Sequence, residues 1–262
     1  MQDFIREESE TLRLNKALSV AGFCSRRKAD ELIKQGKIEI NEKLVTEPGI
    51  KVAPSTDEVK VQGKKVNIFT PAEKDYTYIL LNKPIQVISS SQDPQGRETV
   101  LDILPAALRQ QKLVPVGRLD YMSEGLLLLS NDGEFINKVT HPGFEIPKKY
   151  LLRVRGEVDN KKIEQLENGM TLRDGEKLAP VEVAKLKKKK NKTYLLELVL
   201  HQGKNRQIRR MCRDLDLTIL KLQRTKQGPI ELASLRPGEF RYLSDKEVNE
   251  LKLLAKKNIN AR

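Results

Sequence analysis

Four consecutive leucines, Leu126–Leu129, constrain the fold of this chain more than any other feature of its sequence. The run has the length of one strand, and turn-forming residues at 130–133 close it. Short apolar runs bounded by Ser, Asn, Asp and Gly are typical of strands. The sequence therefore predicts a sheet that contains residues 126–129.

The first part of the chain predicts a small unit of two helices followed by strands. Helical spacing of apolar residues predicts one helix from Leu14 that ends at Gly22. A second helix, capped by Ser25, ends at Gly36. Alternating apolar and polar residues then predict strands at 38–41 and 59–61, with a turn at Gly63-Lys64.

The later part predicts a larger arrangement of strands and helices. Apolar runs predict strands at 78–81 (resumed at 87–88), 150–154 and 194–200. Asn131, Asn205 and Ser244 are suitable caps for three helices. An exposed loop is expected at 92–97, and a short apolar helix or turn at 100–108.

These patterns divide the chain into five parts. We expect a flexible lead-in at 1–11, a small domain at 12–68, a linker at 69–75, a large domain at 76–254 and a basic tail at 255–262. A length of 262 residues suits two domains.

The charge of the chain favours a polyanionic partner. The formal net charge is +13, and most of the excess lies after residue 70. No apolar run is long enough to span a bilayer, and the N-terminus resembles no signal peptide. Two distant cysteines and two histidines imply neither a disulfide framework nor a zinc centre. We therefore expect a cytoplasmic protein without a membrane segment.

Two basic segments stand out. Six lysines lie within 185–192, which is typical of a solvated hairpin tip. In 206–215, apolar residues at i, i+3, i+4 and i+7 predict a helix with one buried face. The same spacing on the other face is occupied by arginines, with few acidic neighbours in the sequence: Arg206, Arg209, Arg210 and Arg213. This helix is a candidate site for a phosphate or carboxylate, although surface helices also carry arginines for solubility.

An isolated aspartate in a loop is usually a turn residue. The residues around Asp120 nevertheless make it a candidate catalytic residue. Gly117 permits an unusual backbone angle, and Leu119 can anchor the loop. Ionised carboxylates serve as nucleophiles at sugar anomeric centres. No second carboxylate is evident nearby in the sequence, which argues against an ordinary glycosidase.

Several motifs, taken together and in order, resemble the ribosomal-RNA pseudouridine synthases of the RsuA/RluB/RluE/RluF branch. The resemblance covers about residues 12–254, and residues 13–43 are similar to the ribosomal-protein S-four type RNA-binding domain. The motifs are Leu81-Asn82-Lys83-Pro84, Gly117-Arg118-Leu119-Asp120, the run from Gly125 to Gly133, Lys148-Lys149-Tyr150 and the run from Gly203 to Met211.

The resemblance implies an α+β fold. A small N-terminal α/β RNA-binding domain would precede a catalytic domain with a mixed, largely antiparallel sheet and flanking helices around a basic cleft. It also implies that Asp120 is the catalytic aspartate, that Tyr150 packs against the target uracil and that Arg209 pairs with the aspartate. Arg118 would help to hold the base out of the stack. No cofactor and no metal are implied.

The implied reaction is the isomerisation of a uridine in ribosomal RNA to pseudouridine. The RNA of the large subunit is the favoured substrate. Asp120 could attack the ribose C1′ or remove the 2′ proton to give a glycal, and both routes stay open. Ribosomal RNA or an assembly intermediate is the expected partner, transfer RNA is a second candidate, and a monomer is expected. RNA contacts are expected from a set of basic residues: Arg13, Lys16, Arg26, Arg27, Lys28, Lys34, Lys204, Arg206 and Arg210.

Two residues depart from the family pattern. Ser123 stands where threonine is usual, and Gln86 stands where glycine is usual. Neither is expected to touch the catalytic set. The alternatives are a non-catalytic RNA-binding factor for ribosome assembly, and a hydrolase, for which the sequence offers neither metal ligands nor a carboxylate pair.

Overall fold

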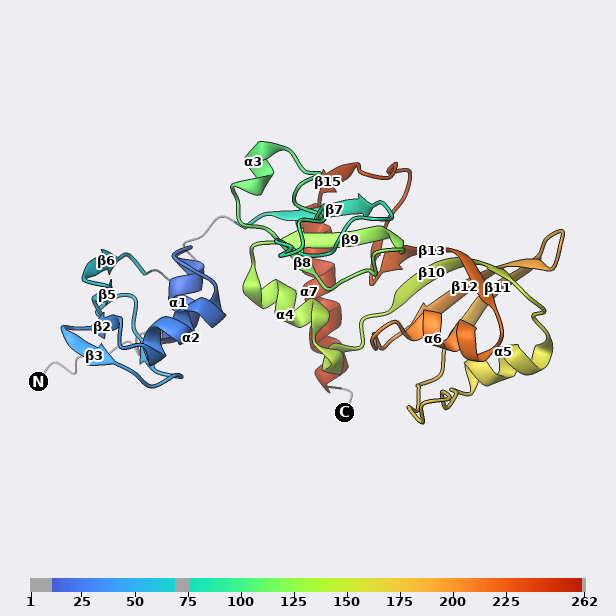
Figure 1. The fold of residues 1–262 in the computed structure, drawn as a ribbon, viewed down its shortest axis with the longest axis horizontal. Helices are drawn as coiled ribbons and strands as arrows, with labels where there is room; N and C mark the ends of the chain where they lie inside the picture. The colour runs from blue at the N-terminus through green and yellow to red at the C-terminus, as the bar shows by residue number, and fades with distance from the viewer. Residues whose placement is uncertain (1–10, 69–75, 261–262) are drawn as a thin grey trace, which may run out of the picture. The chain divides into compact units, whose positions relative to one another are not determined.

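The computed structural model describes residues 11–68 and 76–260, and the chain divides into two compact units, Met1–Asp75 and Tyr76–Arg262 (Figure 1). The expected lead-in, apart from residue 11, and the expected linker lie outside the described residues. Among the described residues, no helix is long and apolar enough to cross a membrane.

The first unit contains two helices and small antiparallel sheets. A four-stranded sheet has the order β3-β2-β5-β6, and β1 pairs with β4. Leu14, Leu18 and Ile33 pack with Ile38 in its core. Ser25 accepts a hydrogen bond from the Lys28 amide and so caps the second helix as predicted. The elements are β1 Leu12–Arg13, α1 Leu14–Val20, α2 Arg26–Lys34, β2 Ile38–Ile40, β3 Lys43–Val45, β4 Lys51–Val52, β5 Val59–Val61 and β6 Lys64–Val66.

The second unit is built on a nine-stranded sheet with the order β11-β12-β10-β13-β9-β7-β15, in which β8 and β14 pair with β9 and β13. Every pairing is antiparallel except that of β13 with β9. The strands are β7 Tyr78–Lys83, β8 Val114–Val116, β9 Glu124–Ser130, β10 Lys148–Arg155, β11 Glu182–Lys188, β12 Thr193–Leu200, β13 Thr218–Gln227, β14 Ile230–Glu231 and β15 Phe240–Tyr242. The helices are α3 Ala106–Arg109, α4 Gly133–Thr140, α5 Asn160–Glu167, α6 Gln207–Asp214 and α7 Asp245–Asn260, with a 3-10 turn η2 at Pro142–Phe144. The α+β fold with a mainly antiparallel sheet is confirmed.

The leucine run lies in β9, and all four leucines are fully buried. Leu126 and Leu128 pack with residues of α4 and α7 on one face of the sheet. Leu127 and Leu129 pack on the other face, with the segment that contains α3 (Figure 1). A strand covered on both faces needs apolar side chains at every position, which explains the absence of alternation.

Several local predictions need correction. Val87 and Ile88 do not extend a strand, because Ile88 forms only an isolated bridge with Thr99. The cap of α4 is Asp132, which accepts hydrogen bonds from the amides of Glu134 and Phe135. Asn131 instead accepts a hydrogen bond from the Thr77 amide.

Two further boundaries differ from expectation. Arg206, with a left-handed φ of 46°, precedes α6, so Asn205 does not cap that helix. The predicted tail at 255–262 is helical as far as Asn260, because Ala255 is fully buried with Val248 and Leu251 on one face of α7. The capping box of Ser244 and Glu247 before α7 is confirmed.

The sheet consists of two halves that meet at one short parallel contact. Glu124 and Gly125 of β9 pair with Gln223 and Arg224 of β13. Gly125 has φ of 103°, and a Cβ at this position would lie 2.3 Å from the carbonyl oxygen of Arg224. Only glycine allows the two backbones to approach so closely.

We predict that Gly125→Ala destabilises the second unit by at least about 2 kcal/mol, because the strands must separate to admit a methyl group. Gly96→Ala is the matched control, since Gly96 also has positive φ but no atom within 4 Å of the added Cβ. This control should cost only about 1 kcal/mol of backbone strain. Urea unfolding followed by circular dichroism measures both values, and equal losses would show that the close approach is unimportant.

Candidate active site

Asp120 lies in the loop between β8 and β9, and buried polar groups hold this loop in place. Gly117 begins the loop with φ of 86°. The Ser89 hydroxyl accepts a hydrogen bond from the Leu119 amide at 3.1 Å and donates one to the Leu119 carbonyl oxygen at 2.9 Å. Leu119 itself is buried, as expected for an anchor. The backbone of the aspartate is therefore fixed from the residue before it.

Lys83 supports the other end of the loop. Its ammonium group is completely buried and donates to the carbonyl oxygens of Pro84 and Ser123, at 2.8 and 2.9 Å. Burial lowers the pKa of Lys83 to about 8, although the nearby carboxylates of Asp120 and Glu124 oppose this shift. The backbone amide of Gln86, at φ of 63°, donates to the Tyr121 carbonyl oxygen.

Arg209, on the first turns of α6, grips the loop that carries Asp120. Its Nε donates to Asp120 Oδ2 at 2.9 Å, and its Nη2 donates to the Met122 carbonyl oxygen and to Ser123 Oγ. The exposed fractions of the Arg209 and Asp120 side chains are 17% and 29%. The predicted meeting of these two groups is therefore present. The expectation that Ser123 does not touch this set is wrong, because its hydroxyl accepts a hydrogen bond from Arg209.

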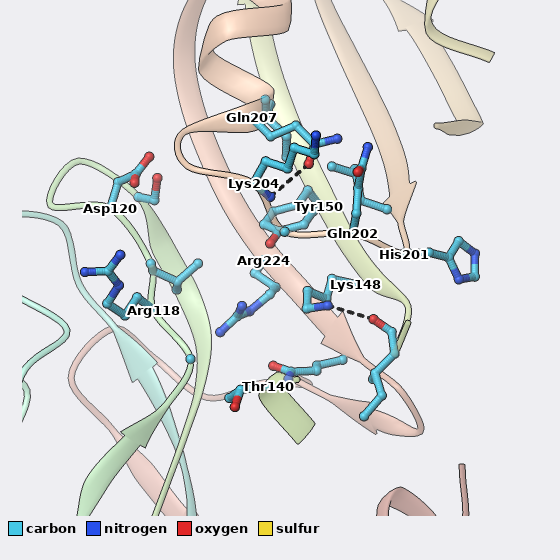
Figure 2. Close-up of a pocket in the computed structure, with 18 of the residues that line it drawn as sticks. Arg118, Asp120, Thr140, Lys148, Tyr150, His201, Gln202, Lys204, Gln207 and Arg224 are labelled. Atoms are coloured by element: carbon cyan, nitrogen blue, oxygen red, sulfur yellow. Dashed lines mark hydrogen bonds between the residues drawn. The ribbon is translucent and has the colours of Figure 1, made fainter. Parts of the chain in front are cut away.

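Asp120 and Arg209 lie in the wall of a pocket of about 400 Å³, within the range of about 300–1,000 Å³ that small-molecule sites span. Figure 2 shows Asp120 and Arg118 on one side of this pocket and Tyr150, Arg224 and Lys148 on the other. The lining contains more cations than carboxylates: Arg118, Lys148, Lys204, Arg206, Arg209 and Arg224 against Asp120 and Glu145. The pocket therefore provides a basic setting for the aspartate.

Tyr150 comes from β10 and is half-buried, with its ring on the pocket side (Figure 2). In the ladder it lies opposite Leu198 of β12 and Arg224 of β13. Two neighbouring strands therefore hold the backbone of Tyr150 on both sides. An aromatic face in this position can stack on a planar ligand.

The arginine face of α6 differs from expectation, because carboxylates neutralise part of it: two that are distant in sequence and one that is adjacent. Arg210 pairs with Asp174 at 2.7 Å and with Glu176 at 2.6 Å, and Arg213 pairs with Asp214. Lys204 also pairs with Glu176, at 2.8 Å. Arg206 lines the pocket and is exposed. The expected RNA contacts of Arg210 and Lys204 therefore compete with existing ion pairs.

In the first unit, the expected RNA-binding residues lie on β1, α1 and α2. Lys16 is half-buried, and Lys28 pairs with Glu31 at 3.0 Å. The Arg26 guanidinium is 3.5 Å from Asn15 Oδ1. The residues that are exposed are Arg13, Arg26, Arg27, Lys28 and Lys34.

Sequence reasoning gave no role to several polar residues around the site. Lys83 and Lys148 stood inside quoted motifs, and Arg224 was one of many basic residues in a long segment. Ser89 carried no signal, because its partner lies thirty residues later in the sequence. Lys148 donates to the Ile146 carbonyl oxygen at 2.8 Å, and burial, together with the charge of Arg224, lowers its pKa to about 8.

The site thus brings a carboxylate, an arginine and an aromatic ring to one basic pocket. Comparisons with known proteins identify the class of enzyme to which such a site belongs. Residues 77–214 match the RNA pseudouridylate synthase family model, and residues 12–59 match the S4 domain model. The chain therefore belongs to the RNA pseudouridylate synthase family.

Named relatives cover nearly the whole chain. A Bacillus subtilis protein named ribosomal large subunit pseudouridine synthase B is 43% identical, over 95% of this chain and 99% of its own length. The Escherichia coli dual-specificity RNA pseudouridine synthase RluF is 36% identical, over 92% of this chain and 78% of its own length. A crystal structure of a pseudouridylate synthase, 27% identical, aligns with a TM-score of 0.64 over 92% of this chain and 99% of that one.

The buried ammonium of Lys83 predicts a pH-dependent contribution to stability. Because its pKa is about 8 in the folded chain and 10.5 ordinarily, the unfolded chain binds more protons between these values. Raising the pH from about 8 to 10 should therefore increase the free energy of unfolding. Lys83→Met removes this contribution, so the stability of the parent protein relative to the variant should rise over this range. Urea unfolding at several pH values tests this, and parallel pH curves would contradict it.

Proposed function

We propose that this enzyme isomerises a uridine of large-subunit ribosomal RNA to pseudouridine and that Asp120 acts on the ribose of the target nucleotide. The observation that carries the proposal is the Asp120–Arg209 ion pair in the wall of a basic pocket, with Tyr150 opposite. The name of the Bacillus subtilis relative supports the large subunit as the substrate. Such a substrate implies a cytoplasmic location, while transfer RNA stays a second candidate substrate.

The reaction breaks the bond from ribose C1′ to uracil N1 and forms a bond from C1′ to C5. Product and substrate contain the same atoms, so no other reactant is required. Asp120 either attacks C1′ to form an ester or removes the 2′ proton to form a glycal, and uracil leaves in both routes. Arg209 would fix the orientation of the attacking oxygen, because it holds Oδ2 at 2.9 Å.

The target base has to leave the RNA stack before it can enter the pocket. Extrusion costs roughly a few kcal/mol and is cheaper in loops. Stacking on Tyr150 would return about 1–3 kcal/mol. Arg118, exposed at the pocket rim beside Asp120, would hold the extruded nucleotide in place. A filled pocket would also exclude water, which would otherwise hydrolyse the ribose intermediate.

The first unit would position the RNA through its phosphates. Its exposed cations lie on α2 and β1, and phosphate contacts fix the register of the RNA without reading its sequence. We propose that Arg13, Lys16, Arg26, Arg27, Lys28 and Lys34 form this contact surface. In this proposal the pocket carries out the reaction, and the basic surface of the first unit binds the RNA.

Asp120→Asn is expected to slow isomerisation by at least about 10³-fold, because the amide can neither attack C1′ nor take a proton. Asp174→Asn is the matched control: Asp174 also pairs with an arginine of α6 but does not line the pocket, and its variant should retain activity. Tritium release from uracil-C5-labelled ribosomal RNA measures both rates. An active Asp120→Asn would remove the mechanism, and no release from the parent protein would favour the non-catalytic assembly factor.

The double variant Arg26→Ala, Arg27→Ala is expected to weaken RNA binding and to flatten its dependence on salt by about one to two in log–log slope. The rate on a saturating minimal substrate should stay the same. Lys65→Ala is the control from the same unit, since Lys65 is engaged with Glu58 at 2.6 Å. Filter binding at several salt concentrations tests the assignment, and an unchanged slope would refute it.

A further inference from the structure

Two cations, Lys148 and Arg224, lie together on the pocket wall opposite Asp120 (Figure 2). They come from adjacent strands, because β10 pairs with β13 and places Tyr150 opposite Arg224 and Lys148 opposite Gln227. Lys148, Tyr150, Arg224 and Gln227 all line the pocket. A planar ligand stacked on Tyr150 would therefore have both cations beside it.

Neither cation has a carboxylate partner. In the described parts of the chain, no ion pair includes Lys148 or Arg224. Lys148 is half-buried, and Arg224 is buried. Arg224 is only 3% exposed: its Nε donates to the Leu126 carbonyl oxygen, and its Nη2 has no partner. Lys148 donates to one carbonyl oxygen only, although an ammonium group carries three donors. Placing two like charges on one pocket wall, partly or fully out of water, is costly unless an anion joins them.

The proposed reaction itself produces such an anion. When the C1′–N1 bond breaks, its electron pair stays on uracil N1 and spreads to O2 and O4. In the ester route Asp120 loses its charge as it bonds to C1′, and in the glycal route it becomes neutral as it accepts the 2′ proton. Both routes therefore move one negative charge from the Asp120 side of the pocket to the base. Fixed cations placed where charge develops lower the barrier.

Gln227 favours uracil over a phosphate as the ligand of this wall. Its Oε1 is buried and has no hydrogen-bond partner, and the residue is 1% exposed. An unpartnered buried acceptor costs free energy unless a donor reaches it. Uracil offers the N3–H between its two carbonyl oxygens, whereas a phosphodiester offers only acceptors.

We propose that Lys148 and Arg224 stabilise the uracil anion released from ribose and that Gln227 accepts the hydrogen bond of its N3–H. This inference rests on the proposed function, and it adds the groups that hold the detached base while it turns from N1 to C5. C1′ then bonds to C5. In the ester route the C1′–O bond to Asp120 breaks, and in the glycal route Asp120 returns its proton to C2′, so both routes regenerate the carboxylate. C5 loses its proton to solvent, and N1 takes a proton from solvent.

The test compares single-turnover rates on the same RNA with uridine or 5-fluorouridine at the target position. Fluorine withdraws electrons and makes the base a better leaving group, so its departure needs less help from the protein. 5-Fluorouridine has no C5 proton, so both reactions are followed by loss of the original nucleoside from nuclease digests. The proteins are the parent chain, Lys148→Met, Lys148→Arg and Lys149→Met. Lys149 is the control because it precedes Tyr150 on the same strand but pairs with Glu197 and does not line the pocket.

Lys148→Met should slow uridine consumption about 100-fold and 5-fluorouridine consumption only about tenfold, with RNA affinity changed less than threefold. Lys148→Arg keeps the charge and should retain most of the rate, and Lys149→Met should match the parent chain. Equal losses on both bases, or an unchanged rate, would overturn the proposal. Weaker RNA binding with a smaller salt slope would assign Lys148 to a phosphate instead. Inactivity of the parent chain would reject the proposed function itself, and thermal melting identifies a variant that fails to fold.

Discussion

The site depends on a parallel contact only two residues long, between β9 and β13. This contact joins two antiparallel halves of the sheet, each with helices against it. Asp120 lies just before β9, Arg209 lies on the helix before β13, and Tyr150 lies on the strand beside β13. Because Gly125 lacks a side chain, the two strands come close enough for the arginine to reach the aspartate. The pocket is therefore a property of the junction and belongs to neither half alone.

Buried and partly buried polar side chains hold the loop that carries Asp120. Lys83, Ser89 and Arg209 together bond the backbone on both sides of the aspartate. Burying an ammonium and a guanidinium in this way costs stability that apolar packing would not cost. These contacts fix the position of the carboxylate before substrate binds. Catalysis by proximity and orientation requires such a preorganised group.

The sequence predicted those parts of the fold that depend on local patterns. It did not predict the contacts that residues make with partners far away in sequence. The leucine run, the helix capped by Ser25 and the buried face of α6 follow from spacing alone. Asp132 displaced Asn131 as a cap because Asn131 is engaged by the Thr77 amide, across 54 residues of sequence. The carboxylates that neutralise Arg210 lie more than thirty residues before it, so the sequence around α6 could not reveal them. Asp120, Tyr150 and Arg209 were predicted from family motifs. The role of Lys83 and Ser89, which is to hold the loop that carries Asp120, is visible only in their hydrogen bonds.

Arg224 belongs to two systems at once. Its backbone faces Gly125 at the junction of the two halves, while its side chain bonds Leu126 and ends beside the pocket. A mutation at this position would change both the stability of the fold and the rate of the reaction. Its effects would therefore be strongly non-additive with those of mutations in β9. Arg118 and Arg206 line the same pocket but are exposed, and neither takes part in the strand junction. A substitution at the junction would therefore change stability and chemistry together, whereas a substitution at the rim would leave the sheet intact.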